Sequence, residues 1–363
     1  MIEKRLGILT SGGDAPGMNA ALRAATMVSL DRGWHVYGIE HGYRGLIQGE
    51  MQRLEAVDVE SLLREGGTTL GTARCAEFTQ LEGRDTARAR LAEARIEALL
   101  VIGGNGSLAG ARALADPAEL GDQILRVVGV PASIDNDIGL TSMAIGVDTA
   151  MNTIVDACDK IADTATAHDR AFIVEVMGRD CGYLAMASSV AAGADVVLFR
   201  ESGKSDAQIV HEVTDAIIEA HGRRHRRRVL IVKSEGTRLS TDDLKARVDA
   251  AIEARGKLIE TRVTVLGHVV RGGRPSAFDR VMASRLGHVG VRALIDGETL
   301  RMVAWQPSGT LPASAIRSAV DPRCYLVDLE DVLRETRAML DGSSPVIQWR
   351  AKVFDEIESV LRL

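Results

Sequence analysis

Aromatic residues, a basic excess, paired cysteines and long hydrophobic runs are all missing or scarce in this chain. Only 3% of its 363 residues are aromatic while 46% are hydrophobic, so its cores depend on aliphatic side chains. That composition favours layered α/β packing over an all-β fold. The net charge of -6 argues against a nucleic-acid binder, because such proteins are more often basic. The length predicts two domains.

The cysteines and the hydrophobic runs also indicate the cellular compartment of the protein. Cys75, Cys158, Cys181 and Cys324 lie far apart and form no CxxC pair, which is typical of reduced thiols in the cytosol. No run approaches about 18 uninterrupted apolar residues, and the first residues form no basic and apolar leader. We therefore expect a cytoplasmic protein without membrane or nucleic-acid partners. The basic run His221–Arg228 is interpreted as a solvated helix end.

Short apolar runs alternate with longer helical patterns. The predicted strands are Arg5–Leu9, Val36–Glu40, Ala98–Ile102, Leu125–Val130, Ala171–Val176, Asp195–Phe199, Arg228–Val232 and Arg262–Leu266. The predicted helices are Asn19–Leu30, Thr86–Ala94, Val147–Thr164, Tyr183–Ala192, Asp206–Ala220, Thr241–Ala254, Ala277–Leu294, Glu330–Leu340 and Ile347–Leu361. This alternation predicts mostly parallel sheets covered by helices, with the long helix from Val147 bridging two domains.

The loops after the strands are where an open α/β sheet binds ligands. "TSGGDAPGMN" (10–19) follows the first strand, and "GGNGS" (103–107) follows another, with Asn105 at the centre of the turn and a helix after the serine. Glycines let a backbone approach phosphate, and a helix N-terminus favours an anion. One such loop is typical of an ordinary turn. Two predict a phosphate site, because both can converge on one sheet edge.

The loop "PASIDNDIG" (131–139) carries two carboxylates, Asp135 and Asp137. One can face a reacting hydroxyl and the other a metal, since phosphoryl transfer needs a base and Mg²⁺ held by oxygen ligands. Alone, the pattern favours an Asx turn that stabilises its own loop, whereas beside the glycine loops it favours the site. His268 and Glu235 can add a donor and a sugar-hydroxyl acceptor. Arginines near strand ends predict at least two phosphate groups, with surface ion pairs as the alternative for any one: Arg74, Arg170, Arg179, Arg262 and Arg271.

Five segments match one family in order and spacing over nearly the whole chain. They are "GILTSGGDAPGMNAALR", "GGTTLGTAR", "SIDNDI", "EVMGRDCGYLA" and "TVLGHVVRGGRPSAFDR". The chain resembles the phosphofructokinase family, most closely its ATP-dependent bacterial type. The resemblance implies two Rossmann-like α/β domains and a homotetramer. It also implies transfer of the γ-phosphate of Mg·ATP to the 1-hydroxyl of fructose 6-phosphate, a step of glycolysis.

The resemblance also implies roles for individual residues. The catalytic positions are Asp135 as the base, Ser133, Arg179 and Arg74. The acceptor-binding positions are Met177, Gly178, Glu235, His268 and Arg271, with Arg170 and Arg262 reaching the 6-phosphate from a neighbouring subunit. The nucleotide positions are Gly13, Tyr43, Arg74, Cys75, Asn105, Gly106, Ser107 and Gly110, and the metal positions are Asn105 and Asp137.

Two departures from the family pattern bear on the phosphoryl donor. Pyrophosphate users resemble "GGDD" and "PKTIDND" where this chain has Gly106 and Ala132, so ATP is favoured. Asn105 stands where the family has Asp, which predicts altered metal handling in a working site. A pyrophosphate donor, another acceptor such as sedoheptulose 7-phosphate, and a non-catalytic regulatory homologue stay open as alternatives.

Domain boundaries and regulation are also suggested by the resemblance. A larger nucleotide-binding domain is expected from residues 1–146 plus 270–325, and a smaller sugar-phosphate domain from 147–269 plus 326–363. Arg23, Asp195 and Arg226 resemble the family's effector pocket, whereas Met27 and Ala162 replace basic residues there. Regulation by ADP or phosphoenolpyruvate is left open.

Overall fold

The computed structural model describes residues 4–121, 124–222, 228–307 and 321–361. Arg226, and with it most of the basic run His221–Arg228, lies outside the described residues. The chain forms two compact units. The first comprises Met1–Ile134, Ile138–Thr149 and Arg271–Arg337, and the second Asp135–Asp137, Ala150–Val270 and Ala338–Leu363.

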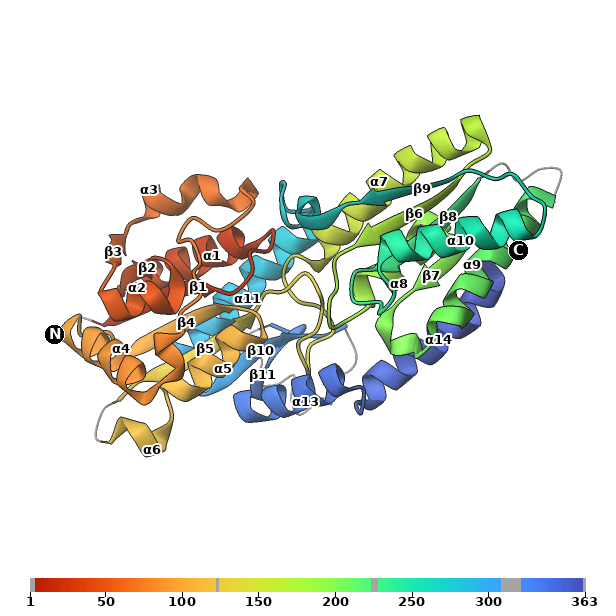
Figure 1. Cartoon of the computed structure of the whole chain (residues 1–363). Helices are drawn as coiled ribbons and strands as arrows, with labels where there is room; N and C mark the ends of the chain where they lie inside the picture. Colours follow the sequence, from red (N-terminus) through yellow and green to blue (C-terminus); the bar gives the residue numbers. More distant parts are fainter. Residues whose placement is uncertain (1–3, 122–123, 223–227, 308–320, 362–363) are drawn as a thin grey trace. The chain divides into compact units, whose positions relative to one another are not determined.

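A seven-stranded sheet with the order β11-β10-β5-β4-β1-β2-β3 is the centre of the first unit (Figure 1). Its strands are β1 (Arg5–Ser11), β2 (His35–Ile39), β3 (Met51–Leu54), β4 (Ala98–Gly103), β5 (Arg126–Pro131), β10 (Arg301–Trp305) and β11 (Cys324–Asp328). The edge strands β3 and β11 are antiparallel to their neighbours and the other pairs are parallel. Every residue of β4 is buried, as expected for a central strand covered on both faces.

Helices cover both faces of this sheet. They are α1 (Met18–Asp31), α2 (Gly42–Gln48), α3 (Ala56–Val59), α4 (Leu81–Glu93), α5 (Asn105–Leu114), α6 (Pro117–Leu120), α11 (Ala277–Ile295) and α13 (Leu329–Asp341), with the short turns η1 (Glu60–Arg64) and η2 (Glu77–Thr79). α1 and α11 pack together on one face, and α2, α4 and α5 cover the other (Figure 1).

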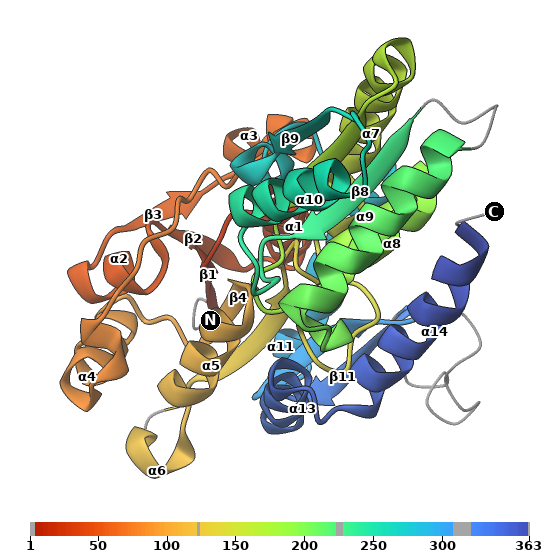
Figure 2. The ribbon, with the colours of Figure 1, turned by 45° about the vertical axis from the view of Figure 1, so that its right-hand side comes forward.

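The second unit has a four-stranded parallel sheet with the order β7-β8-β6-β9. Its elements are α7 (Val147–His168), β6 (Ala171–Val176), α8 (Tyr183–Ala192), β7 (Val196–Leu198), η3 (Arg200–Ser202), α9 (Asp206–Gly222), β8 (Val229–Ser234), α10 (Thr241–Ala254), β9 (Thr261–Val265), η4 (Gly267–Arg271) and α14 (Pro345–Leu361). α9 and α10 lie side by side and share an aliphatic core with the sheet (Figure 2). α8 packs on β7 and β8, and α14 packs against α8.

The predicted mostly parallel α/β architecture is confirmed, and each predicted strand is present. The ranges predicted for β6, α8 and α10 coincide with the observed ones. The edge strands β3 and β11, together with β10 and α2, were not predicted; the β3 segment "MQRL" is short and half polar, so it carries little strand signal. α4 begins at Leu81, not Thr86. The predicted turn centre at Asn105 is wrong, because Gly104 caps α5 and Asn105 is its first residue.

The four cysteines are free thiols. Across the part of the chain that the structure describes, no helix is both long and apolar enough to span a membrane.

Candidate active site

Three loops of the first unit follow β5, β4 and β1, which are neighbours in the sheet. The Ala132 amide donates to the Gly103 carbonyl oxygen at 3.0 Å, which links the loops after β5 and β4. A Cβ on residue 12 would lie 3.1 Å from the Ser107 hydroxyl oxygen, so the loop after β1 lies close to the chain that follows β4. The predicted convergence of the glycine loops on one sheet edge is therefore confirmed.

The first turn of α5 leaves polar groups and space available to a phosphate. The Ser107 hydroxyl is buried and makes no hydrogen bond among the described residues. Around Gly106 the chain is open, since a Cβ there would meet nothing within 4 Å. α5 has ten residues and no acidic side chain in its first turn, so its N-terminus retains the positive end of the helix dipole. A buried unsatisfied hydroxyl, open space and this dipole fit an anionic group of a nucleotide.

Tyr43 packs against the first turns of α5 and holds them in place. Its hydroxyl donates to the Ser107 carbonyl oxygen at 2.6 Å, and its ring stacks on Phe78 with centroids 4.0 Å apart. Burial raises the pKa of Tyr43 above its ordinary value, so the phenol stays a neutral donor. A Cβ on residue 110 would lie 2.7 Å from the Tyr43 ring, so Gly110 permits this packing.

Asn19 and Thr10 hold the segment that leads to Arg74 beside the first loop. The Asn19 side chain donates to the Gly66 carbonyl oxygen at 3.1 Å and accepts from the Thr69 amide at 2.8 Å. The Thr10 hydroxyl donates to the Gly71 carbonyl oxygen at 3.0 Å. Beyond this anchored stretch, Arg74 is exposed and Cys75 is half-buried. The exposed guanidinium of Arg74 therefore follows a segment that hydrogen bonds hold in place.

Arg271 belongs to the first unit and lies against the first glycine loop. Its Nη1 atom donates to the Asp14 carbonyl oxygen at 3.2 Å. The same nitrogen lies 2.8 Å from where a Cβ on residue 13 would be, so Gly13 makes room for the guanidinium. The pairing brings one predicted acceptor-binding residue next to one predicted nucleotide-binding residue.

The loop after β5 alternates between exposed and buried side chains. Ser133, Asp135 and Asp137 are partly exposed, whereas Asn136 is buried. Asn136 has a left-handed backbone with φ 50°, which asparagine tolerates better than most residues. Ser133, Asp135 and Asp137 therefore retain some exposed surface, although the Oδ1 atom of Asp135 is itself buried. Arg350 of α14 donates to the Asn136 carbonyl oxygen at 3.5 Å, and its guanidinium lies 4.8 Å from the Tyr183 ring centroid.

The loops of the second unit follow β8, β6 and β9, which are also neighbours. The Ser234 hydroxyl donates to the Gly178 carbonyl oxygen at 2.5 Å, and the Glu235 amide donates to the Val176 carbonyl oxygen at 2.9 Å. A Cβ on residue 236 would lie 1.9 Å from the Arg179 carbonyl oxygen, so only glycine fits there. The loops carrying Arg179 and Glu235 are thereby locked together.

Within these loops the predicted acceptor residues differ in exposure. Met177 and Gly178 are buried, Glu235 is partly exposed, and Arg179 and His268 are exposed. Beneath the loops, the ammonium of the buried Lys233 lies 3.1 Å from a Glu175 carboxylate oxygen and donates to the Ser234 carbonyl oxygen at 3.3 Å. This buried ion pair supports the strand ends from which the site residues emerge.

Arg170 and Arg262 lie at the opposite end of the same strands. Arg170 immediately precedes β6 and Arg262 is the second residue of β9, whereas Met177 follows the end of β6. At about 3.3 Å per residue, the length of β6 separates these ends by about 17 Å. The second unit therefore does not bring its own Arg170 and Arg262 to the loops that hold Arg179 and Glu235.

Oxygen donors suitable for Mg²⁺ are present at the predicted metal positions. The Asn105 Oδ1 atom is buried at the start of α5, and Asp137 is partly exposed. Nowhere in the described ranges do three His, Cys, Asp or Glu side chains form a metal-binding group. Such a sparse donor set fits Mg²⁺, which keeps several waters and is held largely by substrate phosphates.

Two of the side chains at the positions that resemble an effector pocket make hydrogen bonds within the protein. The buried Asp195 carboxylate accepts from the Leu230 amide at 2.9 Å, which ties it to β8. Arg23 donates to the Glu60 carbonyl oxygen at 3.3 Å.

Ser234, Gly236 and Arg350 were not singled out from the sequence. Ser234 and Gly236 flank Glu235 shortly after the predicted strand Arg228–Val232, so their proximity to a strand end was a usable signal. Arg350 gave none, because it lies on the last helix, 213 positions beyond Asp137 and far from any loop motif.

Two α/β units with glycine-rich loops at the carboxyl ends of parallel strands define a phosphate-binding α/β protein. Comparison with known proteins agrees with that class. The family model "Phosphofructokinase" matches residues 5–294. The chain belongs to the phosphofructokinase family.

Individual relatives match over most of the chain. ATP-dependent 6-phosphofructokinase of Thermotoga neapolitana is 43% identical over 327 residues, covering 89% of this chain and 98% of that protein. ATP-dependent 6-phosphofructokinase of Bacillus pumilus is 46% identical, covering 84% of this chain and 90% of that protein. The solved phosphofructokinase of Saccharomyces cerevisiae superposes with a TM-score of 0.82 at 32% identity. The alignment covers 97% of this chain but spans only 50% of the yeast chain.

Proposed function

We propose that this protein is an ATP-dependent 6-phosphofructokinase, which transfers the γ-phosphate of ATP to the 1-hydroxyl of fructose 6-phosphate. The observation that carries the proposal is the start of α5, where the buried Ser107 hydroxyl has no hydrogen-bond partner among the described residues and the space at Gly106 is open. A side chain at residue 106 would extend into that space, so glycine favours a nucleotide over the smaller pyrophosphate. The names of the bacterial relatives support the same donor and acceptor.

The reaction breaks one phosphorus–oxygen bond and forms another. The acceptor 1-hydroxyl oxygen attacks the γ-phosphorus, the bond to the oxygen bridging toward the β-phosphate breaks, and ADP leaves. Asp135, which is partly exposed in the loop after β5, accepts the hydroxyl proton. Arg179 and Arg74, both exposed, stabilise negative charge on the transferring group, with Ser133 as a neighbouring donor. Asn105 and Asp137 would hold Mg²⁺, which would supply charge neutralisation on the ATP phosphates.

Binding of the two substrates is divided between the loops of the two sheets. Gly13, Tyr43, Cys75 and Gly110 join Arg74 and the first turn of α5 in binding the nucleotide. Met177, Gly178, Glu235, His268 and Arg271 bind the acceptor. We assign the nucleotide to the larger domain, predicted as residues 1–146 plus 270–325, and the sugar phosphate to the smaller one, predicted as 147–269 plus 326–363. The larger compact unit of the structure continues to Arg337, so β11 belongs wholly to it.

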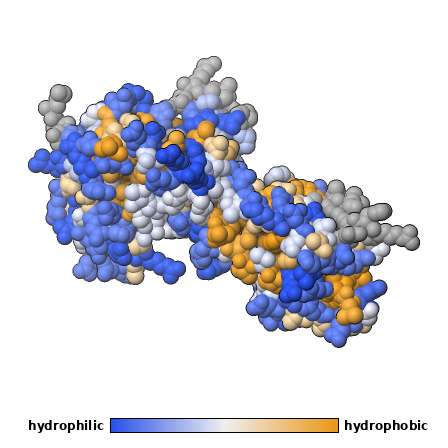
Figure 3. Space-filling model, turned by 90° about the horizontal axis from the view of Figure 1, so that it is seen from above, coloured by the Kyte–Doolittle hydropathy of each residue, from blue (hydrophilic) through white to orange (hydrophobic). Residues whose placement is uncertain are grey.

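The acceptor site requires a second copy of the chain. Arg170 and Arg262 begin the strands whose far ends carry the other acceptor residues, so they serve the site of a neighbouring subunit in a homotetramer. β9 is an edge strand, and Val265 and Val269 near its end are 58% and 62% exposed. Figure 3, which views the molecule from above, shows hydrophobic surface among hydrophilic residues. Such exposed apolar surface is suited to burial against another subunit. The enzyme acts in the cytoplasm.

A steady-state assay of the purified protein with fructose 6-phosphate tests the proposal. Turnover is expected with Mg·ATP and not with Mg·pyrophosphate. Turnover with pyrophosphate alone overturns the argument from Gly106. Absence of turnover with both donors, combined with retained ATP binding in calorimetry, identifies either another acceptor or a non-catalytic homologue; sedoheptulose 7-phosphate as the acceptor separates these two outcomes.

A further inference from the structure

One carboxylate in the second unit is shared by the two arginines that begin β6 and β9. Arg170 Nε donates to Glu260 Oε2, and Arg262 Nη2 forms an ion pair with Glu260 Oε1. We propose that Glu260 is a built-in competitor for the phosphate group that the Arg170–Arg262 pair binds, and so sets the affinity for the acceptor. This inference rests on the proposed function, which assigns that pair to the 6-phosphate.

The backbone fixes the three side chains beside one another. β6 and β9 are parallel neighbours with Ala171 opposite Thr261 and Phe172 opposite Arg262. The Ala171 amide donates to the Glu260 carbonyl oxygen at 3.1 Å, which extends the strand pairing to the residue before β9. Arg170 and Glu260 therefore occupy adjoining positions at the same end of the sheet. Their proximity follows from strand register and not from a flexible surface encounter.

The carboxylate occupies the arginines as a phosphate would. Each Glu260 oxygen engages a different guanidinium, and two oxygens of a phosphate can do the same. The side chains of Arg170, Glu260 and Arg262 are 27%, 45% and 52% exposed. At that exposure an ion pair contributes little and is displaced easily. The triad keeps a net charge of +1, so it still attracts an anion.

Two acidic side chains on α10 and α9 have other partners. Asp249 accepts from the Thr261 hydroxyl and pairs with Lys245 at 2.5 Å. Asp215 pairs with Arg255 at 2.5 Å. Among the contacts of the described residues, Glu260 is therefore the acidic side chain placed on the two arginines.

Glu260 weakens phosphate binding in two ways. Before binding, it must be displaced from both guanidinium groups. After binding, its negative charge stays close to the phosphate and repels it. Glu260→Gln removes the charge while keeping the size of the side chain. Since each exposed ion pair is weak, we expect the half-saturating concentration of fructose 6-phosphate to fall about 2- to 10-fold, with kcat unchanged.

The test compares Glu260→Gln with Glu253→Gln, which removes an exposed carboxylate from α10. Only the first variant is expected to lower the half-saturating acceptor concentration. An unchanged or higher value overturns the proposal, because Glu260 would then be inert or would hold the arginines in place for the substrate.

A binding measurement separates this inference from the proposed function. Inorganic phosphate is titrated against each variant and thermal unfolding is monitored. Glu260→Gln is expected to increase the stabilisation by phosphate, and the increase is expected to vanish in the Arg262→Ala background. Persistence of the increase without Arg262 contradicts the inference. If the wild-type protein fails to phosphorylate fructose 6-phosphate, the proposed function fails, while this titration still decides the role of Glu260.

Discussion

At the scale of single residues, Gly106 is a glycine that the fold does not require but that the choice of phosphoryl donor does. Its Cβ direction is open, and its backbone is not in the left-handed region, so the protein itself tolerates a side chain there. An aspartate in the first turn of α5 even suits the helix dipole. Gly106→Asp is therefore expected to leave the thermal stability unchanged or slightly higher. Its carboxylate would face the ATP phosphates and raise KM for ATP by more than about 10-fold. Gly106→Ala is the control for size, and an unchanged KM in the aspartate variant contradicts the assignment.

Asn105 sits one position earlier and carries the predicted change in metal handling. A full charge about 4 Å from Mg²⁺ is worth up to about 4 kcal/mol at an effective dielectric of about 20, and solvent reduces this strongly. Asn105→Asp is expected to lower the half-saturating Mg²⁺ concentration about 3- to 10-fold. A magnesium titration at saturating ATP measures this, with Gly106→Ala as the matched control on the same turn. The hypothesis fails if both the Mg²⁺ dependence and kcat stay the same.

The residue types in the loops were the predictable part of the site. When glycines, carboxylates and arginines all follow strands, purely structural roles seldom explain the combination. Contacts between residues that lie far apart in the sequence were not predictable. The sharing of Glu260 by Arg170 and Arg262 depends on the register of β6 against β9, which no local pattern encodes. Likewise, Arg350 meets Asn136 only because α14 folds back onto the second unit.

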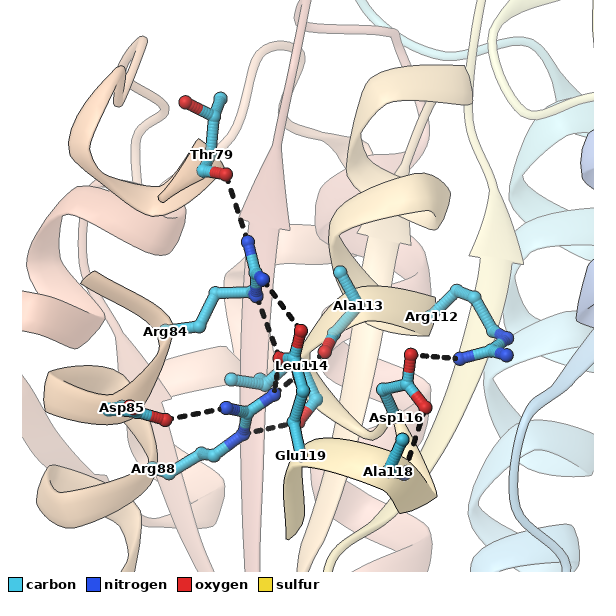
Figure 4. Close-up of polar contacts among 10 residues, drawn as sticks. All are labelled: Thr79, Arg84, Asp85, Arg88, Arg112, Ala113, Leu114, Asp116, Ala118 and Glu119. Carbon is cyan, nitrogen blue, oxygen red and sulfur yellow. Dashed lines mark hydrogen bonds and ion pairs between the residues drawn. The ribbon is translucent and has the colours of Figure 1, made fainter. Parts of the chain in front are cut away.

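At the scale of elements, an ion-pair cluster fastens α6 to α4 and α5. Glu119 of α6 accepts from Arg84 at 2.7 and 3.0 Å and from the buried Arg88 at 2.5 Å (Figure 4). Arg88 also donates to Asp85 at 2.7 Å and to carbonyl oxygens at the end of α5, those of Ala113 and Leu114. Hydrogen bonds from Arg84 and then Arg88 lower the pKa of Glu119 from an ordinary 4.5 to about 2. None of this was predicted, since α6 has only four residues.

The lowered pKa makes the contribution of this cluster depend on pH. The stabilisation is fully present above the unfolded-state pKa near 4.5 and is lost as the pH falls through about 2. Glu119→Gln is expected to lower the free energy of unfolding by about 2 kcal/mol at pH 7 and to flatten its pH dependence below pH 4.5. Chemical denaturation from pH 7 to pH 2 measures both effects. Glu93→Gln, which breaks an exposed pair with Arg90, is the control and should change little. Equal pH profiles for wild type and Glu119→Gln would contradict the role of the cluster.

Strand and helix order was predictable because apolar runs and amphipathic helices alternate over most of the chain. The exceptions share a physical cause. Edge strands such as β3 are half polar, and the start of α5 lies in a glycine-rich stretch whose helical state depends on packing by Tyr43. Local composition carries little information at such positions, so tertiary contacts decide them.

At the scale of the whole molecule, the placement of the arginines predicts that activity requires two chains. Asp135 would act in its own subunit's site, whereas Arg262 begins a strand whose other end faces the acceptor loops and would act in the neighbour's site. Asp135→Asn and Arg262→Ser are therefore each expected to lose most activity alone, the first through kcat and the second through KM for fructose 6-phosphate. Unfolding and refolding the two variants together forms hybrids in which some sites combine an intact base with an intact arginine. Random pairing makes about a quarter of the sites intact, so about a quarter of wild-type activity should return.

The same mixing experiment has a matched control within one chain. Asp135→Asn mixed with Arg179→Ala places both changes in residues proposed to serve their own subunit's site, so no hybrid site is complete and activity should stay low. If activity recovers in the first mixture alone, Arg262 must act in the site of another subunit. Only that arrangement places the two defects in different sites. Equal, low activity in both mixtures would mean that Arg262 serves its own chain or no site at all. Ion-exchange chromatography of each mixture verifies that the hybrids have formed, because the two variants in each mixture differ in charge, so a low value reports on the site and not on assembly.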